Sequence, residues 1–241
     1  MHKSQALSIV RKTKQNYNTM AADWHFTRRF PSAPKIKLLR DLKPSQKVLD
    51  VGCGNGIVAG EIIRRGANYT GLDISAKLLA IARRDYKKAI KNKQAKFVLG
   101  EANKMPFVKN SFDAIFSYAV MHHIPSLELR LGFLKEIHRV LKPGGRVAII
   151  NWNLLNNWSA KRFNIKEQLA HCHPELEAND VFVPWKATKG KKIDRYFHIF
   201  TKPEILSLAR EAGFKKYTAG FYNGEVKPEK NGEELILKLV K

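Results

Sequence analysis

Residues 47–56 read KVLDVGCGNG, an apolar run that ends at Val51 and passes into three glycines at every second position, Gly52, Gly54 and Gly56. A helical pattern, IVAGEIIRRG, follows directly. A short strand, a glycine-rich turn and a helix in this order are typical of a strand–loop–helix unit in a parallel sheet. Glycine lets the backbone turn sharply and approach a ligand closely. The sequence therefore predicts a ligand-binding loop.

Two carboxylates indicate which ligand this loop binds. Asp73 ends a second strand-like run, YTGLDIS, where dinucleotide folds hold the ribose hydroxyls with an acid. Asp50 stands two residues before the first glycine, where it would repel a pyrophosphate but can accept hydrogen bonds from an ammonium group. The glycine spacing also departs from the G-x-G-x-x-G of pyrophosphate-binding loops. These features favour S-adenosylmethionine over NAD.

The segments DVGCGNG and GLDIS resemble motifs I and II of the class I S-adenosylmethionine methyltransferases. The resemblance implies an α/β fold, a doubly wound and mostly parallel seven-stranded sheet of the Rossmann-like kind, with S-adenosylmethionine as the cofactor. The residues that it assigns to cofactor binding are Asp50, Gly52, Cys53, Gly54, Asn55, Gly56, Asp73, Ile74, Glu101, Ala102 and Tyr118. Glu101 is one methylene longer than the Asp that related enzymes usually place beside the adenine.

Helical and strand-like segments alternate along the chain, which favours a doubly wound sheet. A cation-rich helix is expected over 75–96, and strands follow at FVL and at SFDAIFSY, the latter running out at 117–123. The helix LELRLGFLKEIHRVL, closed by PGG at 143–145, precedes a fifth strand, RVAIINW. Thr201 and Glu204 have capping-box spacing at the start of a further helix, and the strand-like runs KYTAGF and ELILKLV come last.

The length of 241 residues suits one α/β domain, 1–241, with two additions. Residues 1–45 form a basic helical segment with ten Lys and Arg against two acids, whose aromatic residues can pack on the sheet. The regular alternation stops over 152–200, which predicts an insertion on the ligand side of the sheet, a usual place for substrate recognition. The KATKGKK run within it is equally consistent with a plain flexible loop.

The formal net charge of +23 is the strongest compositional feature. Like charges repel in the compact state, so such an excess favours a polyanionic partner; a generically basic proteome is the alternative explanation. No apolar run is long enough to span a bilayer and no signal peptide is recognisable, which predicts a cytoplasmic protein. The two cysteines, Cys53 and Cys172, are too few for a disulfide framework, and the HCHP run does not complete a metal site.

Four later motifs narrow the resemblance. The V-P-W within Phe182–Trp185, the R-Y-F-H of Arg195–His198, the A-V-M-H-H of Ala119–His123 and the less faithful HFTRR of His25–Arg29 resemble the tRNA methyltransferases that esterify 5-carboxymethyluridine at the wobble position. The resemblance covers most of the chain. It implies tRNA, bound through the anticodon arm, as the substrate and, as in the eukaryotic members, a small activating subunit as a partner.

The chemistry of esterification fits these residue types. A carboxylate is already ionised at neutral pH, so it needs no general base; it needs positioning and a cationic grip, for which guanidinium groups are well suited. The candidate catalytic residues are Arg28, His122, His123 and Arg195. Arg29 is the alternative to Arg28, one of the two histidines has a structural role, and Arg195 has an ion pair with Asp194 or Glu204 as its structural alternative. Tyr196 and His198 either stack on a base or fill the small core of the insertion.

Two other functions stay open on the sequence. A small-molecule methyltransferase of the quinone or fatty-acyl type shares the early motifs but requires an apolar acceptor pocket. A basic RNA-binding module that keeps the fold without activity is the alternative from another class. The intact Asp50, Asp73 and loop glycines argue against it, because an inactive site does not need them.

Overall fold

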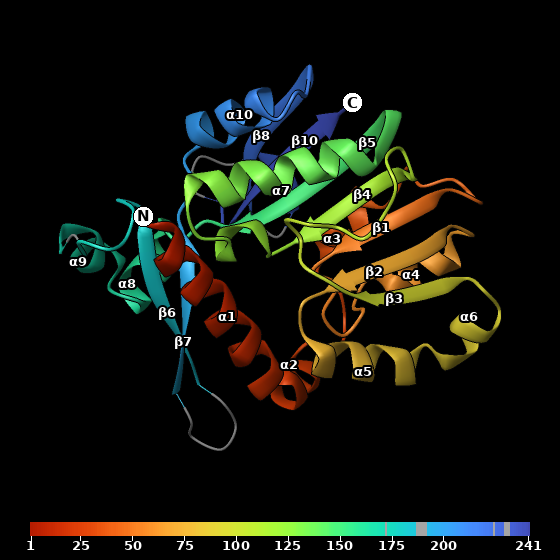
Figure 1. The fold of residues 1–241 in the computed structure, drawn as a ribbon, viewed down its shortest axis with the longest axis horizontal. Coiled ribbons are helices and arrows are strands. Elements are labelled where there is room, and N and C mark those ends of the chain that lie inside the picture. Colours follow the sequence, from red (N-terminus) through yellow and green to blue (C-terminus); the bar gives the residue numbers. More distant parts are fainter. Residues whose placement is uncertain (172, 187–191, 224, 229–231) are drawn as a thin grey trace.

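A central β-sheet with helices on both faces forms the body of the protein (Figure 1). The computed structural model describes residues 1–171, 173–186, 192–223, 225–228 and 232–241. In spatial order the strands of the sheet are β3 (Ala95–Leu99), β2 (Asn68–Asp73), β1 (Lys47–Val51), β4 (Phe112–Tyr118), β5 (Leu141–Trp152), β10 (Glu234–Val240), β8 (Lys216–Asn223) and β9 (Glu225–Pro228). The expected seven-stranded sheet is therefore confirmed, and the short β9 extends its edge.

The strand order creates the ligand-binding edge of the sheet. Strands β3, β2, β1, β4 and β5 pair in parallel, whereas β10 is antiparallel to both β5 and β8. The chain moves outward from β1 to β2 and β3, then returns to the other side of β1 for β4 and β5. Open α/β sheets bind ligands at such a reversal, beyond the carboxyl ends of the strands.

Helices cover the two faces of the sheet and bury alternate strand residues. The helices are α1 (Lys3–Thr19), α2 (Ala21–Thr27), α3 (Ala33–Leu38), α4 (Ala59–Arg64), α5 (Ala76–Asp85), α6 (Lys87–Lys91), α7 (Leu127–Val140), α8 (Asn157–Arg162), α9 (Ile165–Ala170) and α10 (Lys202–Glu211). Val147 and Ile149 of β5 pack with α7 and α10, whereas Ala148 and Ile150 join the core that contains α4 and α5. This period of two is the mark of a strand buried on both faces.

Several predicted boundaries are wrong. The helix expected over 75–96 is divided into α5 and α6 and ends at Lys91, because Lys93 adopts φ 58° and Ala95 already pairs with β2. The 143–145 segment lies inside β5, which begins at Leu141 and shifts register against β4. Strand β4 stops at Tyr118, and the two histidines that follow lie in a 3₁₀ turn, η1 (Met121–His123).

The N-terminal segment and the insertion meet above the carboxyl edge of the sheet. The insertion folds into α8, α9 and a two-stranded ribbon of β6 (Asp180–Lys186) and β7 (Lys192–His198), with a small apolar core of its own. Helix α1 lies between this ribbon and α5 (Figure 1). Asn16 Nδ2 donates to the Asp194 carbonyl at 2.9 Å, and Asn18 Oδ1 accepts from Ser75 Oγ at 3.0 Å. These bonds hold α1 over the ligand-binding edge.

Within the described ranges, no helix combines the length and the apolar composition that crossing a membrane requires. The Thr201–Glu204 capping box is present with both of its hydrogen bonds, as the spacing predicted. The role of 152–200 as a substrate-recognition insertion stays a prediction at this point.

Candidate active site

A cavity of about 370 Å³ opens at the carboxyl ends of β1, β2 and β4, beneath α1 and α2. Most of the expected cofactor residues line it, namely Asp50, Gly52, Cys53, Gly54, Asn55, Asp73, Ile74, Glu101, Ala102 and Tyr118. Gly56 does not line it. A Cβ at Gly56 would meet Tyr86 at 3.0 Å and Phe97 at 3.2 Å, so this glycine allows the loop to pack on neighbouring rings.

The glycine loop requires its glycines at two positions for different reasons. Gly52 has φ +73°, and a Cβ there would lie 2.1 Å from Val120 Cγ2, a side chain of the cavity wall. Gly54 has φ +55°, and a Cβ there would meet nothing closer than Trp24 Nε1 at 3.8 Å. The backbone at Gly54 is therefore open toward the cavity, as close approach to a ligand requires.

Asp73 is fixed by the loop that it faces. Its two carboxylate oxygens accept from Gly54 N and Ser75 N, each at 2.7 Å. Burial raises the pKa of Asp73, while these backbone N–H groups act in the opposite direction. The carboxylate is held in one orientation at the end of β2, as recognition of a pair of hydroxyls requires.

Asp50 is a buried acid whose charge is poorly compensated within the protein. Its Oδ2 accepts from Tyr69 Oη at 2.9 Å. Burial raises the pKa of Asp50 to about 7, although the Tyr69 hydrogen bond and the charge of Lys35 oppose this shift. An ammonium group in the cavity would stabilise the ionised form. The buried Asp50, the open backbone at Gly54 and the fixed Asp73 together fit S-adenosylmethionine.

The raised pKa of Asp50 leads to a pH-dependence prediction for cofactor affinity. With a pKa of about 7, the carboxylate is mostly protonated at pH 6 and mostly ionised at pH 8. We therefore expect S-adenosylmethionine to bind severalfold more tightly at pH 8 than at pH 6, because ionised Asp50 increases about tenfold while the α-amino group of the ligand begins to lose its proton near pH 8. Calorimetric titration at both pH values measures this ratio. The variant Asp50→Asn should bind more weakly and without the pH dependence; a wild-type affinity that is flat in pH would contradict the assignment.

Arg28 lies in the cavity wall and Arg29 does not. The Arg28 guanidinium stacks on Trp24, 3.9 Å from the ring centroid, and its Nη1 donates to Thr27 Oγ1 at 2.9 Å. Burial lowers the pKa of Arg28, and the nearby charge of Arg195 adds to this effect. Of the two candidates that the sequence left open, Arg28 is thus the one that lines the cavity.

Arg195 is buried just behind the cavity wall. Its side chain is 4% exposed, and its guanidinium lies 5.5 Å from the ring centroid of Trp152. Its Nε has no hydrogen-bond partner, and burial lowers its pKa, an effect that the neighbouring Tyr17 opposes. Trp152 and Tyr17 line the cavity, whereas Arg195 itself does not. The expected ion pairs of Arg195 are absent among the described residues, because Glu204 pairs with His198 instead.

The two histidines differ in position. His123 lines the cavity; its Nδ1 donates to the Tyr196 carbonyl at 2.7 Å, and its Nε2 accepts from Tyr17 Oη at 2.7 Å. Burial lowers the pKa of His123 to about 3, so the ring is neutral at pH 7. His122 lies outside the cavity wall, stacks on Phe197 and accepts from Trp152 N. The catalytic role expected for His122 therefore has no support in its position.

Sequence reasoning did not identify Tyr17 or the apolar end of the cavity as parts of the site. Tyr17, on α1, hydrogen-bonds His123 and lies close enough to Arg195 for the two groups to influence each other's pKa. The apolar end of the cavity is formed by Leu7, Val10, Ile124 and Leu129. The helical pattern near Leu7–Val10 was visible in the sequence, but nothing in it indicated that this face would meet the end of β4.

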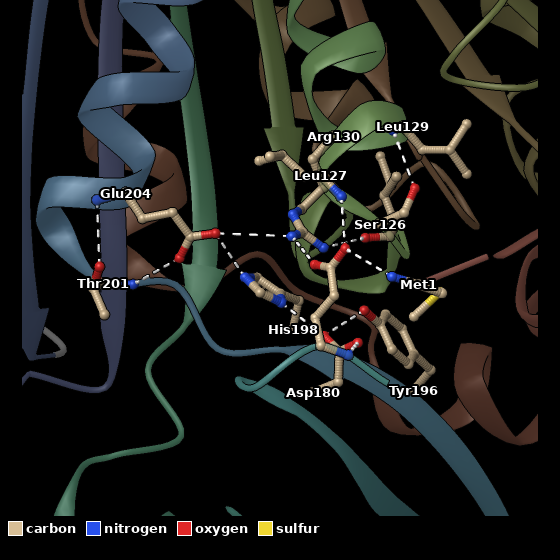
Figure 2. Close-up of polar contacts among 12 residues, drawn as sticks. Met1, Ser126, Leu127, Leu129, Arg130, Asp180, Tyr196, His198, Thr201 and Glu204 are labelled. Atoms are coloured by element: carbon tan, nitrogen blue, oxygen red, sulfur yellow. Dashed lines mark hydrogen bonds and ion pairs between the residues drawn. The ribbon is translucent and has the colours of Figure 1, made fainter. Parts of the chain in front are cut away.

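Tyr196 and His198 hold the insertion to the body of the protein and do not face the cavity (Figure 2). Tyr196 Oη donates to Asp180 Oδ1 at 2.6 Å, and His198 bridges Asp180 Oδ1 at 2.7 Å and Glu204 Oε1 at 2.8 Å. Arg130 Nη2 donates to Glu177 Oε2 at 2.5 Å. Of the two roles left open for Tyr196 and His198, the structural one agrees with these contacts.

Glu177, Asp180 and His198 place ligand atoms within 4.8 Å of one another, a spacing that could hold a metal ion. Their lone pairs and protons are already used by Arg130, Tyr196 and Glu204. Burial lowers the pKa of His198, but its hydrogen bonds to Asp180 and Glu204 outweigh burial and raise it. A protonated imidazole donates hydrogen bonds and does not ligate metal. This cluster is a structural ion-pair network.

The raised pKa of His198 predicts how the network responds to pH. A group with a raised folded-state pKa contributes stability that is complete below its unfolded pKa, about 6.5, and is lost as the pH rises through the folded value. We expect the free energy of unfolding of wild type minus that of His198→Gln to fall by about 1–3 kcal/mol between pH 6 and pH 9. Urea unfolding of both proteins at both pH values measures this difference; a constant difference would show that His198 is neutral.

Two features singled out from the sequence, Cys172 and most of the KATKGKK run (187–191), lie outside the described residues.

Comparison with known proteins extends this description. Residues 49–149 match the family model described as a methyltransferase domain. The chain is 46% identical over 112 residues to the sterol 24-C-methyltransferase ERG6B of Gibberella zeae, covering 46% of this chain and 29% of the relative. It is 33% identical over 149 residues to the mouse tRNA (carboxymethyluridine(34)-5-O)-methyltransferase ALKBH8, covering 61% of this chain and 21% of the relative. The chain thus spans less than a third of the length of either relative.

Two solved structures share the fold. A methyltransferase of Methanosarcina mazei described as S-adenosylmethionine-dependent superposes with a TM-score of 0.65 at 22% identity, covering 85% of this chain and 94% of that one. The complex between the Haloferax volcanii Trm112 methyltransferase activator and the putative methyltransferase matches with a TM-score of 0.65 at 17% identity, covering 95% and 96%. Residues 49–149 therefore match a methyltransferase domain within a fold that both structures share, and the glycine loop with its two carboxylates supports S-adenosylmethionine as the cofactor.

Proposed function

We propose that the protein is a tRNA methyltransferase that converts the carboxylate of 5-carboxymethyluridine, or of a closely related wobble uridine, into its methyl ester. The observation that carries this proposal is a pair of guanidinium groups without acidic partners. Among the described residues no carboxylate forms an ion pair with Arg28 or Arg195. Buried or half-buried cations of this kind are costly unless an anion joins them, and a carboxylate acceptor would supply it.

The residues of the cavity suit an acceptor that is already ionised. When bound, S-adenosylmethionine supplies an activated methyl group. Arg28 lies in the cavity wall, where its guanidinium can orient a carboxylate. Arg195 acts from behind Tyr17, stabilising negative charge at the acceptor in a site of low polarity. Because His123 is neutral with both ring nitrogens engaged, it positions Tyr17 and removes no proton.

The charge distribution supports RNA as the carrier of this acceptor. Exposed cations follow α1, α5 and α6, next to the cavity; they are Arg11, Lys12, Lys14, Lys77, Arg83, Arg84, Lys87, Lys88 and Lys91. Phosphate contacts of this type provide affinity and positioning. The mouse relative, by its name, acts on a carboxymethyluridine at position 34, and we extend that substrate class to this chain as part of the proposal.

A second candidate acceptor is a small apolar molecule. The cavity has an apolar end, formed by Leu7, Val10, Ile124 and Leu129. A small-molecule methyltransferase requires an apolar acceptor pocket, for which these residues are suited, and the fungal relative is named as a sterol methyltransferase. A uridine nucleotide has no apolar group that would fill this end of the cavity. The two candidate acceptors must therefore be compared directly.

Labelled methyl transfer to a panel of acceptors distinguishes the candidates. The purified protein is incubated with methyl-labelled S-adenosylmethionine and, separately, with total tRNA, long-chain fatty acids, quinones and sterols. We expect label in the tRNA that is released by mild base, as a methyl ester is. Label in an apolar metabolite and none in tRNA would replace the leading candidate with the second one. Cofactor binding without transfer to any acceptor would support the inactive RNA-binding module.

An activating subunit belongs to the proposal as a partner. One structural neighbour is a complex with the Trm112 methyltransferase activator, and the same panel repeated with a Trm112-type protein tests this. Transfer that appears only with the activator would assign the partner; equal transfer with and without it would remove the activator from the account.

A further inference from the structure

Two phenylalanines in and just after α2 are exposed to solvent. Phe26, on α2, is 66% exposed and Phe30, three residues after α2 ends, is 85% exposed. Neither belongs to an apolar cluster of the described residues. Isolated exposed aromatic residues are common, but two large rings within five residues form a patch of the kind that marks a binding surface. The packing role expected for N-terminal aromatic residues does not apply to these two.

Arginines accompany the aromatic rings at this place. The Arg29 guanidinium lies 5.6 Å from the ring centroid of Phe26, and that of Arg28 lies 3.9 Å from the centroid of Trp24. Phe30, Trp24 and Arg28 also line the cavity. The exposed patch is therefore continuous with the site of methyl transfer, and its side chains offer flat surfaces and positive charge together.

A row of cations borders the patch. Helix α2 packs against α5, where His25 Nε2 lies 3.7 Å from Asp85 Oδ2 (Figure 1). Beyond this contact α5 and α6 expose Arg84, Lys87 and Lys88. Stacking surfaces beside a basic track are the arrangement with which proteins hold single-stranded nucleic acid, because bases stack on rings and guanidinium planes while phosphates follow the cations.

We propose that Phe26, Arg29 and Phe30 form a stacking platform for unpaired RNA bases next to the nucleotide that enters the cavity, with the α5–α6 cations contacting the adjoining phosphates. This inference rests on the proposed function for the choice of RNA, and it specifies single-stranded loop RNA over duplex. A membrane surface is the competing occupant. The guanidinium over Phe26 argues against it, because a ring covered by a charged group cannot enter the hydrocarbon layer without that charge.

The test compares binding of two RNA probes by fluorescence anisotropy. One probe is an unmodified stem-loop with a seven-nucleotide loop, and the other is a duplex of the same stem length. We expect Phe26→Ala/Phe30→Ala to bind the stem-loop about tenfold or more weakly than wild type, and the duplex unchanged. Val108→Ala, an exposed apolar residue away from the cavity, is the matched control and should bind both probes as wild type does.

Salt dependence separates stacking from phosphate contacts. Loss of stacking should leave the slope of log affinity against log salt unchanged, whereas Lys87→Ala/Lys88→Ala should reduce that slope by one to two. The single variant Phe26→Ala, which does not touch the cavity, should keep wild-type affinity for S-adenosylmethionine and so proves that the fold is intact.

The remaining outcomes are also decisive. Equal stem-loop affinity of wild type and the double variant would overturn the platform, even if wild type methylates tRNA. Binding to vesicles of anionic phospholipid is measured in the same way. If the double variant loses only its binding to these vesicles, the patch binds a membrane and the proposed platform is overturned as well. If the double variant loses stem-loop binding while no RNA is methylated by wild type, the platform stands and the proposed reaction fails.

Discussion

Gly52→Ala is expected to weaken cofactor binding strongly, whereas Gly144→Ala should leave it unchanged. Both glycines adopt φ +73°, so both alanine variants carry the same left-handed strain, about 1–2 kcal/mol. The two glycines differ in the room available for a Cβ atom. A Cβ at Gly52 would lie 2.1 Å from Val120 Cγ2 in the cavity wall, while a Cβ at Gly144 would meet nothing within 4 Å. Overpacking of this kind typically costs a further 1–3 kcal/mol or so.

Calorimetric titration with S-adenosylmethionine and thermal unfolding measure the two effects separately. We expect Gly52→Ala to weaken binding by about 10²-fold or more and to lose more thermal stability than Gly144→Ala, because only Gly52→Ala adds a clash to the backbone strain. In Gly52→Ala/Val120→Ala the clash is relieved and only the backbone strain remains, so part of the affinity should return. Equal cofactor affinity of Gly52→Ala and Gly144→Ala would show that the loop does not bind the cofactor as described.

Removal of either central guanidinium should strongly reduce esterification without loss of cofactor. Arg28→Ala removes the cation in the cavity wall, and Arg195→Ala removes the buried charge near Tyr17. Loss of a preorganised cationic donor typically lowers the rate by about 10²–10³-fold. We expect a fall of this size in kcat/KM for the carboxylate acceptor, with S-adenosylmethionine affinity within about twofold of wild type.

Two controls distinguish this effect from general loss of charge or folding. Arg64→Ala removes an exposed cation on α4, paired with Glu61 and remote from the cavity, and should keep wild-type turnover. Tyr17→Phe should reduce turnover less than Arg195→Ala, because the Arg195 charge stays while only the hydroxyl that bonds His123 is lost. Full turnover by both Arg28→Ala and Arg195→Ala would exclude the proposed grip.

The cofactor half of the site is predictable from sequence because its determinants are local. Asp50 and the loop glycines are consecutive with β1, and Asp73 ends the next strand, so parallel pairing alone brings them to one edge. Glu101 and Ala102 come just after β3, so the parallel pairing of β3 with β2 brings them to the same edge, and both line the cavity. Gly56 packs on neighbouring rings and does not line the cavity, which spacing alone could not indicate.

The acceptor half depends on contacts between distant segments, which no local pattern encodes. Tyr17 belongs to the site because α1 docks on β7, 178 positions away at the Asn16–Asp194 hydrogen bond. His122 and His123 are equivalent in sequence, and only the 3₁₀ turn directs one into the cavity and the other against Phe197. The exposure of Phe26 and Phe30 likewise follows from how α2 lies on α5.

Because the cavity has an apolar end, the choice between an RNA acceptor and an apolar small molecule must be made by experiment. Leu7 and Val10 come from the same helix that supplies Tyr17, so one docking event builds both a polar and an apolar acceptor wall. A carboxylate beside Arg28 with an apolar body toward Leu129 would satisfy both walls, which is why free fatty acids belong in the acceptor panel. Net charge and the exposed cations of α5 and α6 favour RNA.

The measurement that tests the central claim most directly is nucleoside analysis by mass spectrometry of tRNA that carries 5-carboxymethyluridine, after incubation with the protein and S-adenosylmethionine. The account predicts that the acid nucleoside disappears and that its methyl ester, which is heavier by one CH₂ group, appears in equal amount. The variant Arg28→Ala should prevent both changes. An unchanged acid nucleoside, with cofactor bound and a Trm112-type activator present, would contradict the proposed acceptor.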